Sequence, residues 1–219
     1  MSPAPAQPAN LDSPLDPATR ALIRLAAAIA RGDDALVADR SRAAVRADVP
    51  PVWVDELLLQ SVLMVGWPRA LVAAGIWRQE SGARAPATDV SLAEDPGLWR
   101  ARGEKACALI YGDNYRRLRE NVRALHPALD AWMISDGYGR ILSRPALDLK
   151  RRELCTVAQT AVLGTGRQLH SHLRGSLHAG AGPGEVEEAM MLAAEDLTPE
   201  QAAGMRATWE KVVRREGPA

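Results

Sequence analysis

The sequence predicts an all-α protein. Alanine and leucine are its most frequent residues, phenylalanine is absent, and valine, isoleucine and aromatic residues form few alternating runs. Alanine and leucine favour helices, whereas a half-buried strand requires alternating apolar and polar residues. Prolines, glycines and capping residues also divide the chain into segments of helical length. We therefore expect helices throughout.

The charges balance, with 27 basic and 27 acidic side chains. A chain without net charge has no general attraction for nucleic acid or for an anionic membrane, so we expect neither partner. No apolar run approaches the roughly 20 residues that span a membrane. The stretch MSPAPAQPANLDSP does not resemble a signal peptide, and we expect residues 1–14 to be a disordered leader. Because the only cysteines are Cys107 and Cys155, a reduced, cytoplasmic protein is indicated.

The first part of the chain contains four segments of helical length, at residues 17–31, 35–47, 54–66 and 67–77. Asp16 is a typical N-cap, Pro17 suits the first helical position, and Gly32 is a typical stop. The segment VDELLLQSVLMVG (54–66) is apolar almost all round, which indicates a buried helix.

Residues 79–97 lack periodicity and are rich in small and turn residues, which indicates a linker. Helical patterns resume at residues 99–112, 113–125, 149–163, 167–179, 185–197 and from 199 onward. A further helix follows Pro127, and the two glycines of DGYGR (136–140) are expected to break it. Asp148 can cap the helix that Gly164 ends, and TPEQ (198–201) is a capping box.

The chain also matches itself when Leu15 is aligned with Leu147 and the alignment continues without gaps. The 42 pairs from Leu15/Leu147 to Glu56/Glu188 include 11 identities, and Gly32 falls on Gly164. Because the capping and stop positions coincide, this self-alignment predicts a duplicated helical unit.

The segment YGRILSRPALDLKRRELCTVA…RQLHSHLRGSLHAGAGPGEVEEAM resembles the carboxymuconolactone decarboxylase family. The resemblance rests on its RP-x-L, R-x-L and Q-L-x-x-H-L elements, followed by a glycine-rich turn and an acidic helix. Upstream, ARGEKACALIYGDNYRRLREN is similar to the family's leading helix, and DELLLQSVLMVGWPRALVAA in the first half is similar to its E-LLQ…GxPxA helix pair. The resemblance implies two tandem copies of an all-α, alkylhydroperoxidase D-like unit.

We therefore expect a first, degenerate unit at residues 15–78, the linker at 79–97, and a second unit at 98–215 that carries the site. Single-copy members commonly form trimers or hexamers, so the resemblance implies a homotrimer with pseudo-hexameric symmetry. The apolar circumference of residues 54–66 also favours an oligomer, since one unit alone cannot cover it.

The peroxidase branch of this superfamily carries the pattern E-x11-C-x2-C-x3-H. From Glu153, this pattern ends on His172, whereas Thr165 and Gln168 stand at the two cysteine positions. The corresponding residues of the first copy are Ala21, Asp33, Leu36 and Arg40. The resemblance therefore implies one site per chain, in the second half.

Three interpretations of RRELCTVAQTAVLGTGRQLHSH (151–172) compete: a metal site, a thiol redox site and an acid–base pair. His170 and His172 are two residues apart on a predicted helix and point to opposite sides, which argues against a shared ion. Cys155 lies in the apolar stripe of its helix and has no resolving thiol nearby, and Cys107 lies in an equally apolar helix. We therefore expect both to be small buried residues. We favour an acid–base pair of Glu153 and His172, with a structural histidine as the alternative, and expect no metal and no cofactor.

Other polar residues could complete this site. Gln168 lies one turn before His172, where it could orient the ring or bind a substrate carbonyl. Arg140 and Arg144 could hold a substrate carboxylate, or Arg144 could pair with an acidic side chain instead. In a simple antiparallel hairpin Glu153 and His172 would miss each other by about two turns, so their predicted contact requires a steep crossing or a bridge.

The resemblance implies a lyase of aromatic catabolism that acts on a small carboxylated lactone or acid. It would catalyse decarboxylation or a related acid–base reaction without a cofactor. One alternative is an alkylhydroperoxidase-like antioxidant of the peroxiredoxin type, which shares the Glu/His pair but needs the missing thiols. Another is a non-catalytic, oligomeric ligand-binding protein of the same fold.

Overall fold

The computed structural model describes residues 13–216, and helices connected by turns, without any β-strand, make up this part of the chain. The α-helices are Pro17–Arg31 (α1), Asp34–Arg46 (α2), Pro51–Ser81 (α3), Pro96–Tyr111 (α4), Tyr115–Leu125 (α5), Pro127–Trp132 (α6), Leu149–Val162 (α7), Gly166–His178 (α8), Pro183–Ala194 (α9) and Pro199–Glu216 (α10). Three further elements are the 3₁₀ turns Val90–Ala93 (η1) and Gly112–Asn114 (η2) and the π-helix Met133–Leu142 (η3). The predicted all-α fold is confirmed. Most of the predicted leader lies outside the described residues.

Helices begin where the capping residues predict. The Asp16 carboxylate accepts a hydrogen bond from the backbone N–H of Thr19 at 2.8 Å, and Asp148 accepts one from Arg151 at 2.9 Å. Each bond satisfies a backbone donor that has no partner inside the helix. The predicted capping box at the start of α10 also forms, with its two bonds at 2.9 and 3.3 Å.

The helix α3 is two helices joined at Gly66. The backbone of Gly66 has φ 72° and ψ 171°, values that interrupt the helix and suit glycine. Contrary to the expectation from the sequence, the 31 residues of α3 are long and apolar enough, by length and composition alone, to cross a membrane. The break at Gly66 divides α3 into halves that are each shorter than the roughly 20 residues of a spanning helix.

The duplication predicted from the sequence is visible in the helices. The starts of α1, α2 and α3 are Pro17, Asp34 and Pro51, and those of α7, α8 and α9 are Leu149, Gly166 and Pro183. Each pair of starts has the same offset as Leu15 and Leu147 in the self-alignment of the sequence. The correspondence extends beyond the aligned segment, because the second half of α3 falls on α10. Trp77 and Trp209, equivalent under the same offset, are both buried.

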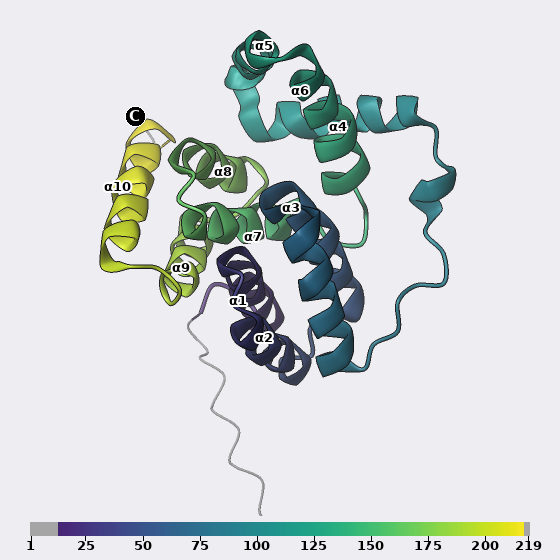
Figure 1. Cartoon of the computed structure of the whole chain (residues 1–219). Helices are drawn as coiled ribbons and strands as arrows, with labels where there is room; N and C mark the ends of the chain where they lie inside the picture. Colours follow the sequence, from purple (N-terminus) through teal and green to yellow (C-terminus); the bar gives the residue numbers. More distant parts are fainter. Residues whose placement is uncertain (1–12, 217–219) are drawn as a thin grey trace, which may run out of the picture.

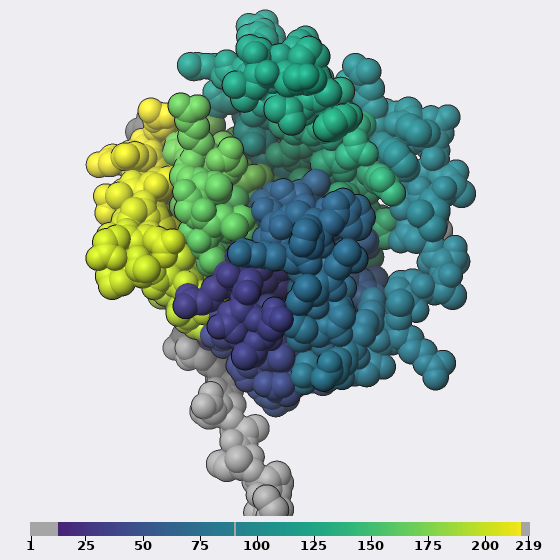
Figure 2. All heavy atoms as spheres, in the orientation of Figure 1, coloured from purple at the N-terminus to yellow at the C-terminus, as the bar shows by residue number. Residues whose placement is uncertain are grey.

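The two copies share one hydrophobic core, with α1 packed against α7 near the centre of the molecule (Figure 1). Each copy also places a helix on the other, since α3 contacts α7 and α9 contacts α1. Two equivalent ion pairs lie across this contact: Arg152 bonds to Glu56 at 2.7 Å, and Arg20 pairs with Glu188 at 3.0 Å. In the space-filling view α10 lies along α8 at one flank (Figure 2). The two copies are therefore halves of one packed body.

The segment from α4 to η3 builds a second, smaller core at one end of the molecule (Figures 1 and 2). The prediction that DGYGR breaks the helix is wrong, because these residues continue it as part of the π-helix η3. The second glycine of the segment, Gly139, is needed for packing instead. A Cβ added to it would lie 1.8 Å from the carbonyl oxygen of Trp99. Gly103 is equally close to the carbonyl oxygen of Ile134, so the two glycines let α4 and η3 cross in backbone contact.

Candidate functional site

Glu153 of α7 and His172 of α8 are in direct contact, with Nδ1 of the imidazole 2.8 Å from Oε2 of the carboxylate. The glutamate is fully buried and the histidine is 6% exposed. The predicted contact is confirmed, and it needs no bridge from Gln168. The assignment of the pair as catalytic stays a prediction.

A glycine makes this contact geometrically possible. Gly175 lies beside the carboxylate, and a Cβ added there would be 2.6 Å from Oε2 of Glu153 and 2.7 Å from the Ile110 side chain. Without a side chain at this point, α8 can approach α7 closely enough for Glu153 to reach the ring. Nδ1 of His178 also hydrogen-bonds to the carbonyl oxygen of Ile110 at 2.8 Å and fixes α8 to α4. Sequence reasoning missed Gly175, although it lies one turn after His172.

The contact orients the imidazole for proton transfer. When Glu153 is ionised it can accept a hydrogen bond only, so the proton of a neutral His172 is held on Nδ1 and Nε2 becomes the basic nitrogen. The second oxygen of Glu153, Oε1, is buried and without a hydrogen-bond partner in the described part of the chain. This oxygen is available to a polar group or to a bound molecule.

Two tyrosines that the sequence analysis did not select lie near enough to Glu153 for its charge to act on both. The rings of Tyr111 of α4 and Tyr138 of η3 meet edge to face at 6.3 Å between centroids. Burial raises the pKa of Tyr138 well above its usual value, and the negative charge of Glu153 contributes to the same shift. Burial likewise raises the pKa of Tyr111, while a hydrogen bond with Tyr138 opposes the shift. Both phenols are therefore neutral donors at physiological pH. Because they lie on other helices than Glu153, no local sequence pattern connects them to it.

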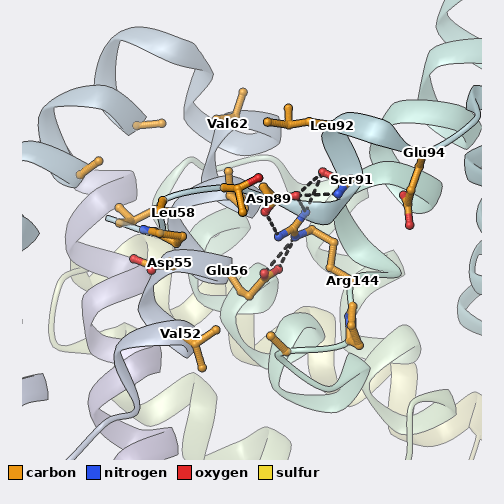
Figure 3. A pocket seen from close by; sticks show the side chains of 18 of the residues that line it. Val52, Asp55, Glu56, Leu58, Val62, Asp89, Ser91, Leu92, Glu94 and Arg144 are labelled. Atoms are coloured by element: carbon orange, nitrogen blue, oxygen red, sulfur yellow. Dashed lines mark hydrogen bonds and ion pairs between the residues drawn. The ribbon is translucent and has the colours of Figure 1, made fainter. Parts of the chain in front are cut away.

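The predicted substrate-binding arginines are engaged within the protein. Arg144 donates to Glu56 at 2.8 and 2.9 Å, to Asp89 at 2.6 Å and to Ser91 at 3.1 Å (Figure 3). Its guanidinium holds the pKa of Asp89 well below the usual range. The structure thus realises the alternative in which Arg144 pairs with acidic side chains. Arg140 lies on η3, with its guanidinium carbon 4.9 Å from the ring centroid of Trp99.

Arg144 borders the cleft drawn in Figure 3, which has a volume of about 560 Å³. Its walls are mainly apolar side chains of α3 and of the segment 86–94. The charged groups at its border form pairs with one another, as in the 2.5 Å contact of Arg78 with Asp55 and the 2.6 Å contact of Arg102 with Glu94. The cleft therefore offers no uncompensated positive charge to a carboxylate.

Gln168 does not complete the site as expected. Its side chain lies on the exposed side of α8, and within residues 13–216 no hydrogen bond connects it to His172. A role in substrate binding stays a prediction.

The two cysteines are in environments that suppress thiol chemistry. Both are fully buried and free of disulfides, and burial raises the pKa of Cys107 to about 12 and that of Cys155 to about 12. The reactive form of cysteine is the thiolate, so neither is prepared for exchange at neutral pH. For metals, residues 13–216 contain no group of three or more His, Cys, Asp or Glu side chains that could hold an ion.

The equivalent position in the first copy is chemically different. Ala21 replaces the glutamate, and Arg40 replaces the histidine and pairs with Glu195 at 3.2 Å. No acid–base pair exists there.

A sequence model of the carboxymuconolactone decarboxylase family matches residues 7–79 and 126–210, which together make up more than half of the chain. The two matched segments cover most of the two copies that the helices define. The comparison with curated proteins found no match. Because the family match covers both copies, the chain belongs to the carboxymuconolactone decarboxylase family as a tandem, two-unit member.

Proposed function

We propose that the protein is a cofactor-free lyase that uses Glu153 and His172 for acid–base chemistry on a small carboxylated lactone or related acid. The observation that supports this most is the buried contact of 2.8 Å between the carboxylate and Nδ1 of the ring. A buried carboxylate–imidazole pair beside neutral phenols has the groups that proton transfer requires. Membership of the family supports the same direction.

In this proposal the C–C bond to a substrate carboxylate breaks and carbon dioxide leaves. The electron pair of that bond moves into the substrate carbonyl and forms an enolate, which a phenol or the imidazolium stabilises by hydrogen bonding. His172 then delivers a proton from Nε2 to carbon and regains one from solvent, while Glu153 holds the ring and its charge. Positioned acid–base groups of this kind contribute about 10²- to 10⁴-fold in rate.

The alternative of an alkylhydroperoxidase-like activity is less well supported. Its cycle needs an accessible thiolate and a resolving thiol, whereas both cysteines are buried with a pKa of about 12. We expect little peroxide turnover, and we expect Cys107→Ser and Cys155→Ser to leave any lyase activity nearly intact. Peroxide consumption that Cys155→Ser abolishes would favour the alternative.

The proposal is tested by following carbon dioxide release from a panel of carboxylated lactones and related acids. The wild type is compared with His172→Ala, and with His126→Asn as a control, because His126 is an exposed histidine at the start of α6 and away from the pair. We expect turnover that His172→Ala removes and that His126→Asn keeps. Turnover that survives His172→Ala would reject the pair as the catalytic centre, whereas absence of turnover across the panel would leave the non-catalytic binding protein as the better description.

We also propose that the chain is a homotrimer. Several large apolar side chains of α3 are exposed, among them Trp67 at 66% and Leu71 at 62%. Exposed apolar surface of this kind on one helix is typical of an interface with another chain. Sedimentation that shows a stable monomer at micromolar concentration would contradict this assembly.

A further inference from the structure

The cleft in Figure 3 has one wall from α3 and another from the segment 86–94. Both halves of α3, before and after the interruption at Gly66, contribute to the first wall. This wall is mainly aliphatic, with Leu58 and Ala74 among its side chains, and Leu92 adds an apolar side chain from the opposite wall. The two walls therefore border a largely apolar space.

Ion pairs hold this second wall against the rest of the chain. Arg144 pairs with Glu56 of α3 at 2.8 Å and with Asp89 of the second wall at 2.6 Å, so one guanidinium group links the two walls (Figure 3). At the end of the second wall, Glu94 pairs with Arg102 of α4 at 2.6 Å. These contacts fix the position of the second wall relative to α3, and they thereby fix the width of the cleft.

The charges of the cleft compensate one another. Four carboxylates and three guanidinium groups of the described residues line it, and each is in an ion pair with another member of this set. Arg152 of α7, which pairs with Glu56 at 2.7 Å, brings the guanidinium groups to four and balances the charge. A charged ligand would lose its hydration without finding an unpaired group of opposite sign, which is unfavourable. The cleft is therefore complementary to a neutral molecule.

The size of the cleft limits its occupant as well. Its volume is about 560 Å³. A helix with its side chains is about 10–12 Å across, so one turn of about 5.4 Å already occupies roughly 400–600 Å³. The helix of a partner protein could therefore place only about one turn in the cleft. Small-molecule sites typically have volumes of about 300–1,000 Å³, and the cleft falls within that range.

We propose that this cleft is a binding site for a neutral, mainly apolar small molecule. Transfer of the ligand's apolar surface from water to the aliphatic walls drives the binding. Neither Glu153 nor His172 is among the described residues that line the cleft, so the site goes beyond the proposed lyase activity and does not depend on it.

Fluorescence titration with N-phenylnaphthylamine, a neutral apolar probe whose emission increases away from water, measures this binding. Anilinonaphthalenesulfonate has the same rings and one additional sulfonate, so it serves as the charged counterpart. We expect the wild type to bind the neutral probe about tenfold more tightly than the sulfonate, because the sulfonate would leave water without gaining a partner.

The variant Ala74→Phe tests the location of the site. The added ring fills part of the space between the walls, so we expect the neutral probe to bind at least about tenfold more weakly. Val72→Phe is the matched control, because it introduces the same side chain on the same helix, at a position that is 48% exposed and outside the lining of the cleft. The control should bind as the wild type does. Thermal melting of both variants separates loss of the site from loss of the fold.

The variant Asp55→Asn tests the compensation of charge. Asp55 pairs with Arg78 at 2.5 Å, so this variant leaves the guanidinium group without its carboxylate. We expect the sulfonate to bind about fivefold more tightly than to the wild type, because it gains a charge-assisted hydrogen bond. The neutral probe should bind as before. A gain of affinity for one probe alone does not follow from damage to the fold, and an unchanged affinity for the sulfonate would contradict the proposal.

Three further results would overturn the site: the wild type does not bind the neutral probe, Ala74→Phe binds it as well as Val72→Phe does, or the sulfonate binds the wild type as tightly as the neutral probe. A second copy of the chain is the competing occupant, because Trp67 and Leu71 line the cleft and are exposed. Probe binding per chain that falls as the chain self-associates at higher protein concentration would assign the cleft to that copy and reject the small-molecule site.

Discussion

The two copies in this chain have the same helices and different chemistry. Their helices begin at positions with one constant offset along the chain, and Asp16 and Asp148 cap equivalent helices. The reciprocal pairs of Arg20 with Glu188 and of Arg152 with Glu56 are equivalent as well. Only the second copy has a carboxylate in contact with an imidazole.

The difference lies in a few side chains and in what covers them. Where the second copy has Gly175, the first has Ala43, so a methyl group stands at the position where the second copy leaves space for its glutamate. The second copy also packs through α8 against α4, and Tyr111 of α4 and Tyr138 of η3 lie near enough to Glu153 for its charge to raise their pKa. Capping and core packing are thus duplicated in this chain, whereas the carboxylate–imidazole contact is present in the second copy alone.

The largest effect is expected when the second copy is given the first copy's residues. Glu153→Ala introduces the residue found at position 21, and His172→Arg the residue found at position 40. We expect each to lower kcat/KM of the proposed lyase by about 10²- to 10⁴-fold, since the proton-transfer pair is lost. Steady-state kinetics measures this, with Glu153→Gln as the variant that keeps the volume of the side chain. A double variant that loses no more than either single variant would show that the two residues act as a unit.

The next effect concerns stability and the two equivalent ion pairs. Arg152 is fully buried against Glu56, whereas Arg20 is 27% exposed and Glu188 keeps hydrogen bonds from Ser13 and from the backbone of Leu15. Breaking a fully buried pair costs about 3–5 kcal/mol when one charge is left without a partner. Because Glu56 keeps its ion pair with Arg144, we expect Arg152→Met to lower the free energy of unfolding by about 2 kcal/mol. Arg20→Met should cost at most about 1 kcal/mol. Urea denaturation measures both, and equal losses would contradict the asymmetry.

A smaller effect is expected at alkaline pH. Burial raises the pKa of each thiol from 9.0 to about 12, so the unfolded chain releases these protons before the folded chain does. The stabilisation is complete below pH 9 and is lost as the pH rises toward 12, by about 1 kcal/mol per thiol at pH 10. Urea denaturation at pH 8 and pH 10 should show that the free energy of unfolding falls less in the variant Cys107→Ala/Cys155→Ala than in the wild type. An identical fall in both proteins would mean that other groups are responsible.

The smallest effect is expected from the reverse exchange. The triple variant Ala21→Glu/Arg40→His/Ala43→Gly gives the first copy the residues of the pair, without the covering tyrosines. We expect no second active site, because the first copy lacks the two tyrosines on which the charge of Glu153 acts in the second copy. When the three substitutions are added to the His172→Ala variant, carbon dioxide release should stay at the level of His172→Ala alone. Restored turnover would show that α4 and η3 are dispensable for the chemistry.

Much of the helical framework follows from short-range signals. Asp16, Asp148 and the capping box before α10 act on the first turn of their own helices, so these helices were predictable from the sequence. The DGYGR segment shows the limit of this reasoning. Glycine at position 139 is read locally as a helix breaker, but it is needed for the crossing with Trp99, which lies on α4 and is distant in the sequence.

The sequence by itself determined the all-α class and the duplication, because caps, periodicity and internal repeats are properties of short segments or of the chain compared with itself. Glu153 and His172 were selected as the candidate pair through the resemblance to the family. Only the tertiary structure decided that the pair touches, that two tyrosines from α4 and η3 lie near Glu153, and that Arg144 is bound by Glu56 and Asp89. These relations depend on which helix faces pack together and how closely. The closeness of two helices is set by the volumes of side chains that are distant in the sequence, and not by the spacing of residues along one helix. Gly175, which has no side chain, is an example.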